Sequence, residues 1–194
     1  MKIVRISVII LIITGFILSC ASTKTTSMTN PNADIRNYRT LLVSAPFQNL
    51  EERKVAEDAL VEEFSKLNLV VLRAIDIIPP VKEYSNEEFK TIFAEKNIDG
   101  VLIVQLTDAY TKTTYQSRSQ TTYNPYTGIN TQTNTNAINK PRREYVVNIY
   151  DSKTSETVWM STSVTKGNAF ADEGTLLKSL AYEIASTFKK DVGL

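Results

Sequence analysis

Cys20 is the only cysteine among the 194 residues, and its thiol stands directly after an apolar segment. Such a thiol can be acylated or can remain a spare structural group, but it cannot form a disulfide within the chain. The residues before it favour acylation after export. Lys2 and Arg5 form a short basic head, and residues 6–18 form an uncharged apolar run. This is the plan of an export signal peptide, since the run is shorter than the ~18 to 20 apolar residues that span a bilayer.

The four residues Ile17-Leu18-Ser19-Cys20 resemble the lipobox of bacterial lipoproteins, in which a small residue directly precedes the cysteine. The resemblance implies that residues 1–19 are removed by cleavage between Ser19 and Cys20. It also implies that the Cys20 sulfur carries a diacylglyceryl group and that the freed amine takes a further chain. Because each buried methylene contributes about 0.8 kcal/mol, two or three chains hold a protein on a membrane almost irreversibly. A membrane is therefore the first predicted partner.

The residues that follow Cys20 carry few large apolar side chains, so we expect residues 20–37 to be a lipidated cysteine with a flexible tether. Position 21 is Ala, and no acidic cluster follows the cysteine. This argues against the retention and surface-export signals known for some lipoproteins. The predicted location is the outer membrane, with the domain facing the periplasm.

The composition excludes several kinds of chemistry. Loss of Lys2 and Arg5 with the signal leaves 22 − 2 = 20 basic residues against 21 acidic ones, so nothing indicates nucleic acid as a partner. The chain has no histidine, which removes the commonest general base and the commonest zinc ligand. We predict no metal, no cofactor and no enzymatic activity. A glycan hydrolase with paired carboxylates, for example Asp108 with Asp151, is the remaining catalytic alternative.

The rest of the chain alternates between apolar runs and amphipathic segments. Strands are predicted at 41–46, 69–78, 101–106, 145–150 and 157–164. Helices are predicted at 50–67 behind Asn49, from the capping box at Ser85 to Asn97, and from Asp172 to Lys190. The order βαβαβββα indicates one α/β domain over residues 38–194, with a single mixed sheet of about five strands and helices packed on it. Trp159, at strand spacing beside Val158, is expected in the core.

Two segments of this pattern carry a resemblance to a known superfamily. They are Glu95-Lys96-Asn97-Ile98-Asp99-Gly100-Val101-Leu102-Ile103 and the strand pair from Ile149-Tyr150-Asp151 to Val158-Trp159. With the strand, long helix and strand before them, they resemble the small envelope lipoproteins related to the amino-terminal domain of the Tol-system translocation protein. The likeness covers most of residues 38–192. That superfamily includes curli-type secretion lipoproteins and lipoprotein activators of peptidoglycan synthases, so the resemblance implies binding and assembly more than catalysis.

Residues 111–139, between the third and fourth predicted strands, form a polar insertion longer than a compact domain needs. Residues 124–128 have turn chemistry, and Thr131, Thr133 and Thr135 alternate with amide side chains as in a strand that is polar on both faces. A mobile polar loop and a projecting β-arm both fit this pattern.

The insertion and its flank are basic, because no acidic residue lies between Thr111 and Arg143. Tyrosines alternate with the cations, and such residues contact cell-wall glycan, anionic lipid headgroups or another protein. The candidate partner-binding residues are Tyr115, Arg118, Tyr123, Tyr126, Arg142 and Arg143.

The leading interpretation is a non-enzymatic, membrane-anchored envelope lipoprotein whose periplasmic domain binds an envelope protein or cell-wall glycan, or assembles as a homo-oligomer. The alternative is a subunit of an oligomeric secretion or pore complex. The insertion lacks the alternating apolar residues that a lipid-facing strand requires, which weighs against the alternative.

Overall fold

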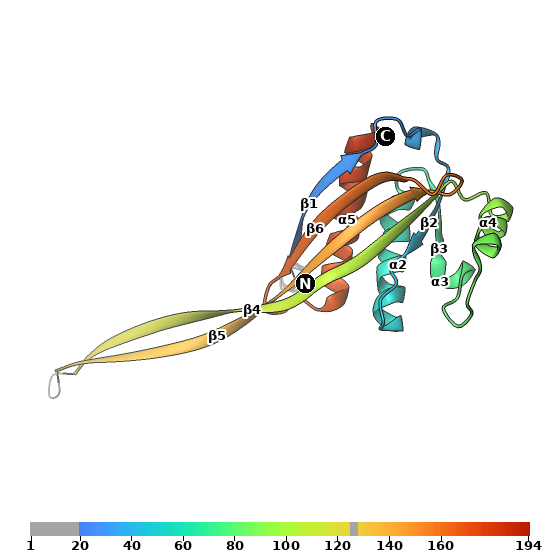
Figure 1. The fold of residues 1–194 in the computed structure, drawn as a ribbon. Coiled ribbons are helices and arrows are strands. Elements are labelled where there is room, and N and C mark those ends of the chain that lie inside the picture. Colours follow the sequence, from blue (N-terminus) through green and yellow to red (C-terminus); the bar gives the residue numbers. More distant parts are fainter. Residues whose placement is uncertain (1–19, 125–127) are drawn as a thin grey trace, which may run out of the picture.

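The computed structural model describes residues 20–124 and 128–194, so the predicted signal peptide with Ser19, and also Tyr126, lie outside the described residues. A six-stranded sheet with the order β1-β6-β5-β4-β2-β3 forms the centre of the molecule (Figure 1). The strands are β1 (Ala21–Thr29), β2 (Thr40–Ser44), β3 (Val70–Arg73), β4 (Gly100–Asn124), β5 (Gly128–Asp151) and β6 (Thr157–Gly167). The helices are η1 (Ile35–Asn37), α2 (Leu50–Ser65), α3 (Ala74–Ile77), α4 (Asn86–Glu95) and α5 (Glu173–Val192).

The sheet is mixed, which confirms the predicted fold class. β2 pairs in parallel with both β3 and β4, as expected where a helix connects the strands. The pairs β4–β5, β5–β6 and β1–β6 are antiparallel.

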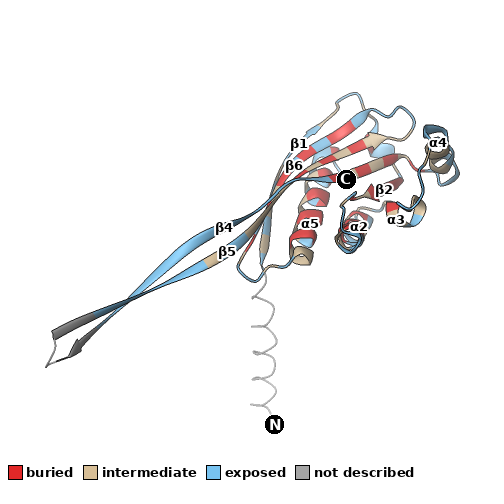
Figure 2. Ribbon diagram, turned by 60° about the horizontal axis from the view of Figure 1, so that its bottom comes forward, coloured by how far each residue is buried: buried red, intermediate tan, exposed pale blue. Residues whose placement is uncertain are grey.

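Most of the core lies on one face of the sheet, which we call the helix face because α2 and α5 cover it (Figure 2). Trp159 is fully buried there and meets the ring of Phe188 on α5 edge-on, with ring centroids 5.7 Å apart. Its indole N–H donates to the carboxylate of Asp191 at 2.9 Å, which satisfies the only polar atom of the side chain. The prediction that Trp159 is a core residue is confirmed.

The opposite face of the sheet is less covered, and we call it the open face. A second, smaller apolar cluster around Leu42, Ala74 and Ile98 lies there, where α3 and α4 pack beside β2. Over β1, β6 and β5 the face carries exposed side chains, among them Met28, which is 71% exposed, and Met160, which is 41% exposed.

The tether predicted for residues 20–37 is wrong over Ala21–Thr29, which form the edge strand β1 along the whole of β6. Every second residue of β1 faces the helices, and three of these residues bond to a hydroxyl or carboxylate. Thr23 bonds to Thr165 and to Ser179 at 2.9 Å each. Thr25 bonds to Ser163 at 2.8 Å, and Ser27 donates to Asp191 at 2.6 Å. A segment with few large apolar residues can therefore still be a strand, because its hydroxyls satisfy polar groups that β6 and α5 bury.

The strand predicted over residues 69–78 is too long, since β3 ends at Arg73 and α3 begins at Ala74. The buried carboxylate of Glu57 on α2 accounts for the change. It accepts from the backbone N–H of Ile75 at 2.8 Å, from that of Ala45 at 3.2 Å, and from the Arg53 guanidinium at 2.9 Å. A carboxylate at the start of α3 satisfies donors that a strand would have turned to a neighbour.

Helix starts follow the sequence signals closely. Asn49 accepts from the amides of Glu51 and Glu52. Ser85 and Glu88 form the expected capping box. Asp172 accepts from the amide of Thr175, which confirms the third predicted cap.

The polar insertion forms a two-stranded ribbon, because β4 and β5 stay paired from the domain to Asn124 opposite Gly128. Of the two structures that fitted the sequence, the projecting β-arm is the one observed. It leaves the domain beyond Tyr110 and Arg142, the last of its pairs in which the β5 residue also pairs with β6, and points away from the domain (Figure 1). At about 3.3 Å per residue its fourteen positions in β4, residues 111–124, span roughly 46 Å.

Removal of β1 is predicted to destabilise the domain. A chain that begins at Asn30 loses at least three side-chain hydrogen bonds worth about 1 kcal/mol each, so its free energy of unfolding falls by about 3 kcal/mol or more. Its melting temperature, measured by circular dichroism, should lie roughly 6–12 °C below that of a chain that begins at Cys20 with Cys20→Ser.

A matched pair of point variants distinguishes the effect of the side-chain hydrogen bonds of β1 from the effect of shortening the chain. Thr25→Ala removes a hydrogen bond on the helix face and should lower the melting temperature, whereas Thr26→Ala on the exposed face should not. Equal melting temperatures for all four chains would contradict the paired strand and would support a flexible tether at residues 21–29.

Candidate functional site

Cys20 lies at the end of the sheet from which the ribbon departs. Ala21 pairs with Gly167, and the carbonyl of Cys20 accepts from the N–H of Asn168 at 3.1 Å. The side chain of Cys20 is exposed. No linker residue separates the predicted lipid attachment point from the first strand, so a lipid on Cys20 would hold this end of the domain at the membrane surface.

The base of the ribbon is fixed by a β-bulge and two arginines. The register of β4 against β5 shifts between Leu106 and Asp108, where Thr107 donates to the carbonyl of Glu144 at 3.0 Å. Bulges of this kind increase local twist and redirect a strand. Arg143 points to the helix face and forms a salt bridge of 2.9 Å with Glu173 at the start of α5. Arg142, on the other face, lies over the ring of Tyr110 with 5.4 Å between guanidinium and centroid.

One face of the ribbon is uncharged and rich in hydroxyls, and we call it the hydroxyl face. Three hydroxyl pairs bond across the strands: Ser117 with Thr135 at 3.1 Å, Ser119 with Thr133 at 3.0 Å, and Thr121 with Thr131 at 3.3 Å. Tyr115, which is 72% exposed, lies opposite Ala137 on the same face. Cross-strand hydroxyl pairs stabilise such ribbons modestly.

The other face carries amides and cations, and we call it the cationic face. Lys112 lies directly opposite Lys140, and Arg118 lies opposite Asn134. Alternation along each strand places Gln116, Asn136, Gln120 and Gln132 on this face as well. The two faces are therefore chemically different, although the sequence shows only a mixed polar run.

The structure does not bring the candidate partner-binding residues together at one site. Tyr115 and Arg118 lie on opposite faces of the ribbon, and Arg143 is engaged with α5. Tyr123 lies opposite Ile129 in the ribbon, and nothing is described of its side chain. Tyr110 was missed, and only its spacing to Arg142 in a known register could have revealed the pair.

The carboxylate pair of the hydrolase alternative is not formed. Asp151 lies opposite Gly100, and Asp108 lies opposite Glu144, eight positions further along β4. At about 3.3 Å per residue, that separation is roughly 26 Å, far more than the ~5 to 10 Å between paired glycosidase carboxylates. Asp151 instead accepts from the Tyr38 hydroxyl at 2.6 Å. Burial alone would raise the pKa of Asp151, but the hydrogen bonds from Tyr38 and from backbone amides outweigh it and lower the pKa.

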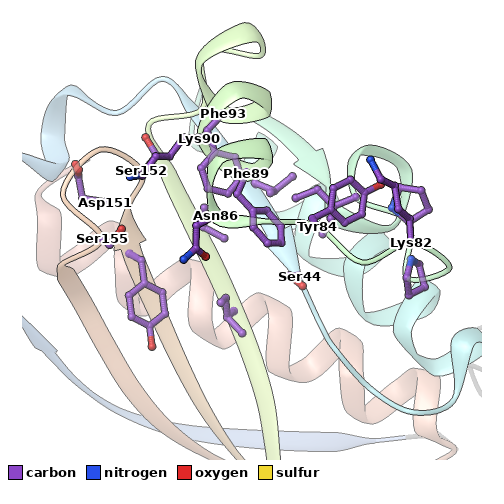
Figure 3. A pocket seen from close by; sticks show the side chains of 18 of the residues that line it. Ser44, Lys82, Tyr84, Asn86, Phe89, Lys90, Phe93, Asp151, Ser152 and Ser155 are labelled. Atoms are coloured by element: carbon purple, nitrogen blue, oxygen red, sulfur yellow. The ribbon is translucent and has the colours of Figure 1, made fainter.

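A groove of about 730 Å³ lies on the open face between α4 and the strands β2 and β4. Figure 3 shows Phe89 and Phe93 of α4 together with Tyr84 from the preceding loop around it. Most of its lining is apolar: Leu42, Ile78, Tyr84, Phe89, Phe93, Val101, Ile103 and Tyr150. No residue of α4 is fully buried, so this helix packs only lightly against the rest of the domain.

Comparison with known proteins shows the fold. No protein-family model and no curated protein matches the sequence. The PelC dodecamer from Paraburkholderia phytofirmans has 13% identity to the chain and a TM-score of 0.51, with 84% of this chain and 95% of that chain covered. Lipoprotein GNA1162 from Neisseria meningitidis has 13% identity and a TM-score of 0.43, with 78% and 99% covered.

The likeness to PelC shows a shared fold. The narrower superfamily related to the Tol-system protein stays a prediction. Within the described ranges, no helix combines the length and apolar character needed to cross a membrane.

The groove wall should respond to acid through Glu88. The hydrogen bond from Lys82, and then those from Ser85, lower the pKa of Glu88 from an ordinary value of 4.5 to about 2. Because the folded pKa is the lower one, these contacts stabilise the start of α4 above pH 4.5 and lose their effect as the pH falls toward about 2. Hydrogen-exchange protection factors of α4 should fall over that interval.

Glu88→Gln should flatten this pH dependence, whereas the matched variant Glu87→Gln in the same helical turn should retain it. Identical pH profiles for the wild type and Glu88→Gln would contradict the assignment.

Proposed function

We propose that this protein is a lipid-anchored component of the bacterial envelope that acts through contacts made by its ribbon, and that it is not an enzyme. The ribbon carries the proposal, because its described side chains are almost all exposed and it contributes nothing to the core (Figure 2). Two registered strands of this length add no stability that the domain needs, since an isolated hairpin is only marginally stable. A contact with another molecule explains why the chain extends them.

The hydroxyl face suits a protein or glycan partner. This face is uncharged from Thr111 to Thr121 and contains an exposed tyrosine. Tyrosine and short hydroxyl side chains supply contact area and adaptable hydrogen bonds with little loss of side-chain entropy. An envelope protein or the cell-wall glycan is therefore the proposed partner, and the outer membrane facing the periplasm is the proposed location.

Assembly with further copies of the same chain is the second candidate. Beyond Tyr110 and Arg142 the outer edges of both ribbon strands have no neighbour in the described sheet, and such edges can pair with another chain. The dodecameric PelC has the same fold, which supports an oligomer of this type. The ribbon side chains are polar on both faces, which argues against a lipid-facing role.

The anchor is tested by metabolic labelling. Labelled palmitate should enter the wild-type protein, and Cys20→Ala should abolish both the label and retention on washed membranes, because no other thiol is present in the chain. Ser22→Ala serves as the matched control, since it alters a neighbouring exposed residue and should leave labelling intact. Full labelling of the Cys20→Ala variant would refute the anchor.

The ribbon is tested by shortening and by cross-linking. Lys112 and Lys140 face each other, so Asn-Gly can join them as a two-residue hairpin loop in place of residues 113–139. The shortened protein should melt within a few degrees of the wild type, because the deleted side chains bury little apolar area.

A photoreactive residue at position 119, on the hydroxyl face, should give discrete adducts in the envelope, and adducts of two copies would indicate the oligomer. A folded, anchored protein that gives no adduct from this position would refute the ribbon as the contact element.

A further inference from the structure

Four cations gather on the open face beside Cys20, and we call them the basal patch: Lys112, Lys140, Arg142 and Lys166. The register fixes their arrangement. Ser22, Lys166, Arg142 and Tyr110 lie in one row across β1, β6, β5 and β4. Lys112 and Lys140 form the next row outward, about 7 Å further along the strands.

The predicted lipid attachment point belongs to the same surface. Side chains alternate along β1, so Cys20 falls on the side of Ser22 and Lys24, which is the open face. Strands lie about 4.8 Å apart, so β1 is two strands, or about 10 Å, from β5. The basal patch therefore lies within the width of one or two lipid headgroups from the anchored residue.

The patch contains two unsatisfied features that an anion would resolve. Lys112 and Lys140 are directly opposite each other, and like charges in that position destabilise a β-ladder. The Nε of Arg142 is buried and has no hydrogen-bond partner among the described residues. The carboxylates nearest on this face are Asp108 and Glu144, and Glu144 is engaged with the terminal nitrogen of Arg142 at 3.2 Å.

We propose that the basal patch binds the phosphate of an anionic lipid headgroup in the membrane that holds Cys20, and so turns the open face of the sheet toward that membrane. The proposal rests on the anchor of the proposed function, and it adds a ligand class and an orientation. A phosphate between Lys112 and Lys140 relieves their repulsion and accepts from Arg142. The hydroxyl face of the ribbon, on the opposite side, stays free for a partner.

The test uses the acylated protein in vesicles and two single-cysteine variants that differ by one position. Thr114→Cys lies on the cationic face beside Lys112, and Thr113→Cys lies on the opposite face. With Cys20 acylated, the new thiol is the only one that takes a fluorophore. In phosphatidylglycerol vesicles that carry a nitroxide on the headgroup of a tracer lipid, quenching should be severalfold stronger at position 114 than at 113.

The charge dependence distinguishes the patch from orientation by the anchor alone. Each cation near an anionic surface strengthens association about fivefold, so the triple variant K112Q, K140Q and K166Q should weaken association of the patch with the anionic headgroups roughly a hundredfold. The difference in quenching between positions 113 and 114 should then vanish. Its melting temperature should be unchanged or raised, because a repulsion is removed. The matched variant K54Q, K178Q and K190Q, with exposed lysines of α2 and α5 on the opposite side of the sheet replaced, should keep the difference.

Equal quenching at the two positions in the wild type, or an unchanged difference in the triple patch variant, would overturn the proposal. Loss of the difference on addition of inorganic phosphate alone would show a site for free anions and would also overturn it. A protein that leaves the vesicles on washing would refute the anchor instead. The patch is then judged from cosedimentation with phosphatidylglycerol vesicles, where binding by the triple variant at wild-type strength would refute it.

Discussion

The pairing of β1 with β6 decides how the molecule can sit relative to its predicted anchor. Nine consecutive residues from Ala21 onward are held in register, and their inward hydroxyls are bonded to β6 and α5. A tether of the same length would let the domain move tens of ångströms from the membrane and rotate freely. A paired strand removes that freedom. The end of the sheet at Cys20 is then fixed next to the predicted anchor, and the base of the ribbon lies at a fixed distance from it.

The sequence was sufficient for the parts of the fold that depend on local signals. Capping residues at Asn49, Ser85 and Asp172 located the helix starts, because a side-chain oxygen that satisfies free amides acts within one turn. Continuous apolar runs located the central strands, because a strand that is buried in a sheet needs apolar side chains and these are visible in the local sequence. The α/β class followed from the order of these elements.

The rest depended on partners far away in the chain. In β1 the choice between strand and tether is made by Thr165, Ser163 and Asp191, more than 130 residues later. At the short helix α3 the choice between strand and helix depends on Glu57, and no pattern in residues 69–78 indicates that this carboxylate is buried beside them. The two chemical faces of the ribbon required the register of β4 against β5, and a bulge near Thr107 set which residues share a face. Polar strands specify register weakly by themselves. The candidate residues could therefore be named from the sequence, but they could not be assigned to one face of the ribbon or the other.

The ribbon obtains its register from the domain, and this determines where along it a binding site can be built. Both of its strands begin in the core, with Leu102, Val104, Val147 and Ile149 fully buried, so the costly first pairing is already formed when the chain leaves the sheet. Beyond Arg142 the ribbon is continued by backbone bonds and by hydrogen bonds between polar side chains, and order established at the base must weaken along a polar two-stranded segment. A geometry of several converging charges is therefore best held in the first rows, beside the salt bridge of Arg143 with Glu173. The distant part of the ribbon is better suited to a repeated, tolerant contact such as that of the hydroxyl face, in which no single position carries the interaction.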